Sequence, residues 1–289
     1  MKIGILINPK ARRFNPKQVH TIASYFRRKG HHIRVAFIKR RGDGEIIARS
    51  LAGDGFDVVA ACGGDGIVTD VAEGLIHTNT ALAVLPAGTT DVFAQEMGIP
   101  RNALKASLLI EKGLKKKIYT GVINGNRHFL VMCGVGFDAM IIKTVSNRFK
   151  KRWGKLSYIS SGLFHMLKYH GKQIDVKIDG EKERCFTLII GNAKRYGGSF
   201  SVTPHASVFR EKLDVCMFRG KGMGYEVLFH ALLIVLSFHL KLKSIKYQSF
   251  EKMEILTPGI PVHIDGDFFG FTPLTIEIEK DLLPVIVPQ

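Results

Sequence analysis

A chain of 289 residues is longer than most single hydrophobic cores, so its length alone predicts two domains. Its 42 Lys and Arg outnumber its 25 Asp and Glu, which gives a net charge of +17. Such a charge favours an anionic partner (nucleic acid, an acidic membrane surface or a polyphosphate) and says nothing about fold. The 4 cysteines are far apart and lack the spacing of a metal site, so we expect reduced, buried thiols in a cytosolic protein.

The sequence predicts contact with a membrane surface rather than a membrane span. Residues 1–7 lack the layout of a signal peptide, and the longest apolar stretch, Val227 to Leu240, is too short to cross a bilayer. We favour a core helix for that stretch, with a membrane-facing helix as the alternative. Basic residues cluster at 39–41, 115–117, 148–155 and 241–243. Each cluster alone is typical of a solvated face. Together they favour an anionic surface, so we expect a cytoplasmic protein peripheral to the membrane.

In the first half of the chain, strand patterns alternate with helix patterns. Short apolar runs predict strands at 2–7, 33–38, 58–62 and 81–85. Helices are expected from Pro16 to Gly30, at 45–51, at 68–75 and from Val92. This alternation predicts an α/β domain with a doubly wound parallel sheet, in which ligands bind beyond the carboxyl ends of the strands.

The loops after those strands suit the binding of phosphate. Gly63-Gly64-Asp65-Gly66 follows a strand and opens a helix, where glycines let the backbone approach a ligand and the helix N-terminus favours an anion. A divalent cation between carboxylate and phosphates explains an Asp in such a loop, and a tight turn with an Asp cap is the structural alternative. The other strand ends supply Asn8, Lys39, Gly88 and Thr89. Neither glycine loop matches a Walker A loop or a G-x-G-x-x-G fingerprint.

The second half of the chain favours β structure. Asn124-Gly125, between runs at 119–123 and 128–133, predicts a hairpin with a two-residue turn. After the segment Gly134 to Ala139, a helical stretch of about 25 residues is expected to run to Tyr169. Strands are expected at 173–178, 183–190, 200–203, 213–218, 251–256, 260–265 and 273–279. These strands predict an antiparallel β domain with one or two helices.

Several short motifs are spread along nearly the whole chain. They are Leu6-Ile7-Asn8-Pro9, Gly63 to Gly66, Leu85 to Ala94 closing in Gly98-Ile99-Pro100, Gly136 to Ala139, Gly191 to Gly198, and Leu213-Asp214-Val215. In this combination they resemble the diacylglycerol kinase catalytic-domain family, which includes bacterial soluble lipid kinases and the sphingosine and ceramide kinases. The resemblance implies a nucleotide-binding domain at 1–118, to which residues from about 280 to 289 return. It also implies a β-sandwich-like lipid-substrate domain at 119–279, with the active site between the two.

Two Ile-Asp-Gly-acid segments, which contain Asp179 and Asp265, have the pattern of a type I′ hairpin turn, and each taken alone favours a structural turn. In the family, the catalytic Asp lies in an Asp-Gly-acid motif near the C-terminus, ahead of a Thr-Pro. Asp265, upstream of Thr272-Pro273, has that position, and we leave Asp179 as a turn. The resemblance therefore implies Asp265 as general base and Asp267 as a residue that helps to position it or the metal.

The predicted function is ATP-dependent phosphorylation of a hydroxyl on a diacylglycerol-like or sphingoid lipid, as in phospholipid metabolism. The resemblance implies that Mg-ATP is held by the loops described above, with Asp65 reaching the Mg²⁺. Two alternatives stay open: a lipid-binding or regulatory member with weakened catalysis, and a soluble kinase of the NAD kinase type. No nucleic-acid motif is present, so we expect no nucleic-acid partner. Pairing of edge strands into a homodimer is left open.

Several positions depart from the family pattern. Ile67 stands where a Thr usually follows the glycine loop and offers no hydroxyl, and Thr69-Asp70 replaces an Asn-Glu pair. Val92 and Tyr119 stand where two Asp residues help to hold a structural Mg²⁺ in some bacterial members. We therefore expect apolar packing in place of that second metal site.

Overall fold

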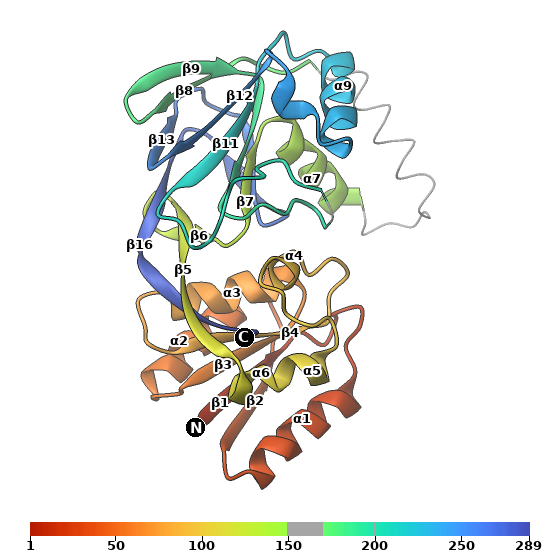
Figure 1. Ribbon diagram of the computed structural model, residues 1–289, viewed down its shortest axis with the longest axis vertical. Coiled ribbons are helices and arrows are strands. Elements are labelled where there is room, and N and C mark those ends of the chain that lie inside the picture. Colours follow the sequence, from red (N-terminus) through yellow and green to blue (C-terminus); the bar gives the residue numbers. More distant parts are fainter. Residues whose placement is uncertain (149–169, 199) are drawn as a thin grey trace. The chain divides into compact units, whose positions relative to one another are not determined.

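The computed structural model describes residues 1–148, 170–198 and 200–289 (Figure 1). The chain forms two compact units. Residues 1–120 and 279–289 make up unit 1, and residues 121–278 make up unit 2. The chain crosses between the units within two strands, β5 (Leu114–Ile123) and β16 (Leu274–Val287).

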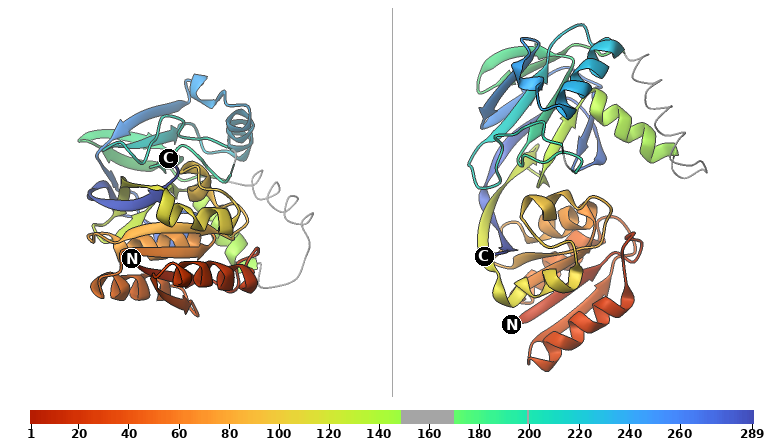
Figure 2. Two further views of the ribbon diagram at one scale, coloured as in Figure 1. Left: turned by 60° about the horizontal axis from the view of Figure 1, so that its bottom comes forward. Right: turned by 45° about the vertical axis from the view of Figure 1, so that its right-hand side comes forward.

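Unit 1 is an α/β unit whose parallel strands follow the order β2-β1-β3-β4, with the end of β16 beside β4. The strands are β1 (Lys2–Ile7), β2 (His32–Phe37), β3 (Val58–Gly63) and β4 (Ala81–Pro86). The helices are α1 (Pro16–Arg28), α2 (Asp43–Gly53), α3 (Asp65–Leu75), α4 (Val92–Glu96), α5 (Ala103–Ser107) and α6 (Leu109–Lys112). Because β3 and β4 are buried over their whole length, their sequences are unbroken apolar runs. The predicted doubly wound parallel sheet is confirmed (Figures 1 and 2).

The helices cover both faces of this sheet because the direction of winding reverses after β2. From β1 the chain passes through α1 to β2, and from β2 it returns through α2, past β1, to β3. Right-handed crossovers therefore put α1 on one face and both α2 and α3 on the other. Helices α2 and α3 approach each other closely at Gly74, since a Cβ on this residue would lie 2.3 Å from the carbonyl oxygen of Glu45.

The first helix begins and buries its residues as its sequence predicts. The side chain of Asn15 accepts a hydrogen bond from the backbone N–H of Lys17, and Pro16 takes the first helical position. The buried residues of α1 are Val19, Ile22, Ala23 and Phe26. Their spacing is that of a single helix face, which packs on the sheet.

Unit 2 contains two antiparallel sheets, which confirms the predicted β-sandwich-like architecture. One sheet has the order β12-β11-β10-β7-β14-β15; the other has the order β16-β13-β8-β9, and the β5–β6 hairpin joins it at β16. The strands are β6 (Arg127–Phe129), β7 (Met132–Val135), β8 (Ile174–Ile178), β9 (Glu181–Cys185), β10 (Thr187–Gly191), β11 (Leu213–Phe218), β12 (Ile245–Phe250), β13 (Lys252–Ile255), β14 (Pro261–Ile264) and β15 (Asp267–Phe271). The helices are α7 (Phe137–Arg148), α9 (Gly224–Val235) and the short 3₁₀ turn η1 (His239–Lys241).

Three of the strands predicted in this half are wrong. The run 128–133 is divided between β6 and β7, and the run 183–190 between β9 and β10. At both divisions the chain changes sheet without a Gly or Pro to mark the change, so the sequence pattern does not reveal it. Residues 200–203 form no strand and contribute only an isolated bridge from Phe200 to Tyr196. The sequence pattern also fails to predict β12 and β15.

Two further expectations need adjustment. The turn between β5 and β6 has three residues rather than two, because Ile123 pairs with Arg127. Asn124 and Gly125 nevertheless both have positive φ, as an Asn-Gly pair favours. The helix expected to reach Tyr169 is observed as α7. The rest of the expected stretch, with most of the basic cluster at 148–155, lies outside the described residues.

The apolar stretch favoured as a core helix is a surface helix. It forms α9 and the turn after it, and Leu228, Leu232 and Leu236 are exposed there. The core prediction is wrong because the stretch is apolar on every side, so its sequence does not distinguish an inner face from an outer one. Within the described ranges, no helix is long and apolar enough to cross a membrane.

Candidate active site

The parallel sheet brings the predicted phosphate loops side by side. Backbone hydrogen bonds continue past the strand ends: Asn8 N donates to Cys62 O at 3.0 Å, and Ala87 N donates to Gly63 O at 2.8 Å. The loops after β1, β3 and β4 therefore start at one edge of the sheet, where ligands bind in doubly wound folds. Lys39 lies at the same edge, just beyond β2, and its side chain is exposed.

The two glycine loops touch through backbone atoms. A Cβ on Gly88 would lie 2.5 Å from Cα of Gly64 and 2.5 Å from Oδ1 of Asp91. Any side chain at Gly88 would force the loops apart, which is a physical reason for glycine at this position. The two loops thus form one surface at the N-terminus of α3, where backbone N–H groups and the helix dipole favour an anion.

Asp65, the first residue of α3, ties the first loop to the second. Its Oδ1 accepts a hydrogen bond from the backbone N–H of Phe93 at 3.0 Å, and its Oδ2 accepts one from the Thr90 hydroxyl at 3.3 Å. The side chain is half-buried. A carboxylate of this kind beside a surface for phosphates fits Mg²⁺, which proteins hold with one or two carboxylates while phosphates and water complete its coordination.

An ion pair between Arg13 and Asp91 fixes the second loop. Nε of Arg13 donates to the carbonyl oxygen of Gly88 at 2.8 Å, and Oδ1 of Asp91 accepts from N of Gly88 at 2.9 Å. Burial raises the pKa of Asp91, while the hydrogen bond from Gly88 and the charge of Arg13 act in the opposite direction. Sequence reasoning misses this pair. Its members are far apart in the chain, and the only signal is that each follows a strand ending at the same sheet edge.

The remaining predicted residues of unit 1 differ in what their side chains do. Oδ1 of Asn8 accepts a hydrogen bond at 3.0 Å from the backbone N–H two residues ahead, so it holds the turn after β1. Thr89 is exposed. Ile67, where the family has Thr, is buried, and its Cγ2 would lie 2.5 Å from a Cβ placed on Gly63. Ile67 therefore packs beneath the glycine loop rather than facing solvent.

In unit 2, Asp265 occupies the turn between β14 and β15 with a φ of +48°. Its Oδ1 accepts backbone hydrogen bonds from Val131 at 2.9 Å and Met132 at 3.0 Å, and its Oδ2 accepts one from Leu130 at 2.9 Å. These three donors hold the carboxylate in place. Asp267 lies exposed at the start of β15.

The turn at Asp179 is built in the same way. Asp179 has a φ of +46°, and its Oδ1 accepts hydrogen bonds from Glu251 N at 3.2 Å and Lys252 N at 2.9 Å. Local geometry therefore does not separate the two Asp-Gly turns. Their surroundings differ, because burial raises the pKa of the Cys133 thiol, and Asp265 and the carboxylate of Asp138 both lie close enough to raise it further.

A polar cluster consists of Asp138, His263 and Tyr196. Asp138, in the first turn of α7, is hydrogen-bonded to Nε2 of His263 and accepts a hydrogen bond from the Tyr196 hydroxyl. Burial opposes charge on Asp138, but His263 and Tyr196 outweigh it and lower the pKa of Asp138. The pKa of Cys133 is raised by burial and then by the charges of both Asp265 and Asp138, so the two carboxylates share one neighbourhood.

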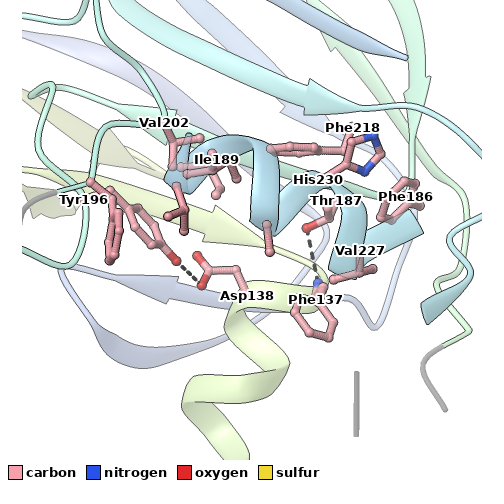
Figure 3. A pocket seen from close by; sticks show the side chains of 14 residues that line it. Phe137, Asp138, Phe186, Thr187, Ile189, Tyr196, Val202, Phe218, Val227 and His230 are labelled. Atoms are coloured by element: carbon pink, nitrogen blue, oxygen red, sulfur yellow. Dashed lines mark hydrogen bonds between the residues drawn. The ribbon is translucent and has the colours of Figure 1, made fainter. Parts of the chain in front are cut away.

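Asp138 and Tyr196 line a cavity of about 230 Å³ whose other walls are almost entirely apolar. Figure 3 shows their hydrogen bond on one side and the rings of Phe186 and Phe218 on the other. Helix α9 closes part of the cavity with Val227, Ala231, Ile234 and Val235. An apolar space with a single carboxylate is suited to an apolar chain that carries a polar group.

Comparison with known proteins covers both units. Residues 2–123 match the family described as the diacylglycerol kinase catalytic domain, and residues 131–287 match the YegS C-terminal NAD kinase beta sandwich-like domain. The chain belongs to the diacylglycerol kinase catalytic-domain family. The family resemblance predicted from the sequence motifs is thereby confirmed.

Bacterial members of this kinase family are similar over most of the chain. The diacylglycerol kinase of Bacillus subtilis (strain 168) is 24% identical over 276 residues, covering 93% of this chain and 90% of that one. A YegS-like lipid kinase of Pseudomonas aeruginosa (strain UCBPP-PA14) is 31% identical over 206 residues, covering 69% of this chain and 67% of that one. A crystal structure of a diacylglycerol kinase from Bacillus anthracis str. Sterne has the same fold. Its TM-score is 0.73 at 20% identity, covering 99% of this chain and 96% of that one.

This family member is a lipid kinase of the diacylglycerol kinase and YegS type. It is an enzyme that uses ATP as a substrate and transfers phosphate to an alcohol group of a lipid. The predicted kinase activity is therefore confirmed at the level of the family.

Proposed function

We propose that the acceptor is a diacylglycerol-like lipid whose chain occupies the cavity of unit 2, and that Asp265 is the general base for its hydroxyl. The cavity carries this proposal, because an apolar space with the charged carboxylate of Asp138 suits a lipid chain that ends in a polar group. Relatives named diacylglycerol kinase support the same acceptor. A sphingoid lipid is the second candidate, since its amino group would pair with ionised Asp138.

In this proposal the nucleotide is bound by unit 1. Backbone N–H groups of the glycine loops at 63–66 and 88–89 receive the phosphates, Asn8 holds the adjoining turn, and Lys39 adds positive charge. Asp65 would hold Mg²⁺, which when bound neutralises charge on the phosphates. The Arg13–Asp91 pair keeps the second loop in its conformation.

The reaction is a transfer of one phosphoryl group. The proton of the lipid hydroxyl passes to the carboxylate of Asp265 while the hydroxyl oxygen bonds to the γ-phosphorus of ATP. The bond from that phosphorus to the bridging oxygen breaks, and ADP leaves with the electron pair. Catalysis of this kind comes mainly from positioning and from neutralising the charge that develops. Asp267, two residues after the base, helps to position it or the metal.

The proposal is tested by ATP consumption with Mg²⁺ against a panel of acceptors in mixed micelles. The panel contains diacylglycerols, sphingoid bases and NAD, and one sample has no acceptor. A rate that requires diacylglycerol supports the proposal, and a rate that requires a sphingoid base selects the second candidate. A rate with NAD alone contradicts both and supports a kinase of the NAD kinase type. Clear ATP binding without turnover supports a member with weakened catalysis, and Ile67→Thr is then the first reversion to test.

The place of reaction and the oligomeric state are also proposals. The net charge of +17 favours the surface of an anionic bilayer as the place where the enzyme meets its lipid. β12 and β15 are the two edge strands of the sheet β12-β11-β10-β7-β14-β15, and such edges are where a second copy would pair. Sedimentation at several protein concentrations tests whether a homodimer forms.

A further inference from the structure

Helix α9 exposes an apolar face of unusual extent for a surface helix. This face, called here the α9 face, consists of Tyr225, Leu228, Phe229, Leu232, Val235 and Leu236. The side chain exposure is large: Leu232 is 55% exposed and Val235 is 57% exposed. A surface helix normally turns charged residues toward water, and a contiguous exposed apolar patch marks a site of interaction.

The spacing of these residues places them on one side of the helix. Positions 225, 228, 229, 232, 235 and 236 follow the helical repeat, whereas Val227, Ala231 and Ile234 line the cavity on the other side. The single charged residue of α9 is Glu226. Its carboxylate accepts hydrogen bonds from the backbone N–H groups of Lys221 and Met223, so it caps the helix start. The α9 face therefore contains no charge of its own.

The charges around the α9 face are positive. The sequence from 227 to 250 contains no Asp or Glu, and it contains Lys241, the last residue of η1, and Lys243. Lys246, further on, is paired with Glu183 and does not count toward this charge. Lys241 and Lys243 are exposed just after the helix, and Nζ of Lys241 lies 4.6 Å from the ring centroid of Phe238. An apolar helix face flanked by lysines and free of acidic residues is complementary to an anionic lipid surface.

The same charges disfavour a second copy of the chain as the occupant. Two copies that met through their α9 faces would bring together the lysines of both, on molecules that each carry a net charge of +17. Like charges would then oppose the apolar contact. An anionic bilayer instead offers hydrocarbon for the leucines and negative headgroups for the lysines.

We propose that the α9 face, together with Lys241 and Lys243, docks this protein on an anionic lipid bilayer. Docking also has a consequence for the cavity, and this part rests on the proposed function. Val235 both belongs to the α9 face and lines the cavity, and Phe200 lines the cavity and is 43% exposed. Apolar side chains are thus continuous from the docking surface to the cavity, so a lipid chain can pass between them without contact with water.

The test is binding to vesicles without ATP, measured by co-sedimentation with phosphatidylcholine vesicles that contain or lack phosphatidylglycerol. The double variant Leu228→Gln/Leu232→Gln changes exposed side chains outside the cavity lining, and Lys241→Gln/Lys243→Gln removes two charges. Ile46→Gln is the matched control, because Ile46 is a large apolar side chain of unit 1 that is 69% exposed. Melting temperatures of all variants are compared to show that each one folds.

We expect the wild type and Ile46→Gln to bind the anionic vesicles equally. The leucine variant should bind at least about tenfold more weakly, since it loses two exposed apolar side chains that docking would bury in the bilayer. The lysine variant should bind about 30-fold more weakly at low salt, since each lysine near an anionic surface contributes about a factor of five. Equal binding by the wild type and the leucine variant would overturn the proposal. So would a concentration-dependent dimer that the leucine variant abolishes while no form binds vesicles.

A separate readout distinguishes this proposal from the proposed function. Phosphorylation of a short-chain, monomeric acceptor needs no bilayer, so the leucine variant should keep its turnover on that acceptor. Loss of vesicle binding with retained turnover supports docking through the α9 face. If no form shows turnover but the leucine variant still binds vesicles more weakly than the wild type, the proposed function is contradicted and docking through the α9 face is supported.

Discussion

The glycine loops of unit 1 depend on the absence of side chains at two positions. Gly64 and Gly88 let the loops meet backbone to backbone, and the Arg13–Asp91 pair holds the second loop against the first. Asp65 completes this arrangement through its hydrogen bond from Phe93. Each of these interactions joins two segments that the sheet brings together. Removing any one interaction should therefore change the conformation of both loops.

The substitution Gly88→Ala tests this dependence. The added Cβ would lie 2.5 Å from Cα of Gly64, so the loops must separate. We expect destabilisation of about 1–3 kcal/mol, which is typical of overpacking, and ATP affinity reduced about tenfold or more. Gly53→Ala is the control, since a Cβ at Gly53 in α2 meets nothing within 4 Å. Thermal denaturation and calorimetric ATP titration measure both effects. Unchanged ATP affinity in Gly88→Ala would contradict a role for the loop contact in nucleotide binding.

How much of the site could be predicted from the sequence differs from residue to residue. The glycine loops and Asn8 follow strands with a clear apolar pattern, so their gathering at one sheet edge follows from the parallel order alone. Arg13 and Asp91 could not be predicted as partners, because no periodicity links residues that meet only through the sheet. The cluster of Asp138 and His263 is missed for the same reason, since it joins α7 to β14.

At the scale of elements, one carboxylate joins the end of α1 to α6. Glu111 accepts hydrogen bonds from the Tyr25 hydroxyl at 3.1 Å and from Nζ of Lys29 at 2.9 Å, and lies 2.8 Å from Nε2 of His31. The hydrogen bond with His31, followed by those from Lys29 and Tyr25, lowers the pKa of Glu111 to about 2. The folded state therefore holds this carboxylate in its charged form more strongly than the unfolded chain does.

The pH dependence of this link follows from the direction of the shift. Because the pKa is depressed on folding, the stabilisation is full above the usual pKa of 4.5 and is lost as the pH falls toward about 2. Glu111→Gln should therefore melt below the wild type at pH 7, and the difference should shrink as the pH falls through that window. Glu251→Gln is the control, since that exposed carboxylate lies 3.9 Å from Lys212. A difference in melting temperature that stays constant with pH would show that the charge of Glu111 is not the source of the stabilisation.

Helix α9 has two apolar sides with different predicted roles. Ala231 lines the cavity, so Ala231→Phe should fill part of the space of about 230 Å³. We expect the KM for a long-chain acceptor to rise about tenfold or more, while a short-chain acceptor is affected much less. Leu228→Phe places the same ring on the α9 face, where it should leave both KM values unchanged. Equal effects of the two substitutions on the long-chain acceptor would contradict the cavity as the binding site for the lipid chain.

At the scale of the whole molecule, the fold could be predicted further than its details. The alternation of strands and helices predicts the parallel sheet of unit 1, because each strand is a separate apolar run between helices. In unit 2 the chain changes sheets at 129–132 and at Phe186 without a Gly or Pro to mark the change, so two predicted strands are each divided. The exposed position of α9 could not be predicted either, since a helix that is apolar on all sides shows no outer face.

The most direct test compares Asp265→Asn with Asp179→Asn, because both residues occupy left-handed turns and both carboxylates accept backbone hydrogen bonds. Phosphate transfer from ATP to diacylglycerol in mixed micelles is measured, together with ATP binding and melting temperature. We expect Asp265→Asn to lose a factor of about 10²–10⁴ in turnover while it still binds ATP, and Asp179→Asn to stay near the wild-type rate. Near-normal turnover in Asp265→Asn, or an equal loss in both variants, would contradict Asp265 as the general base.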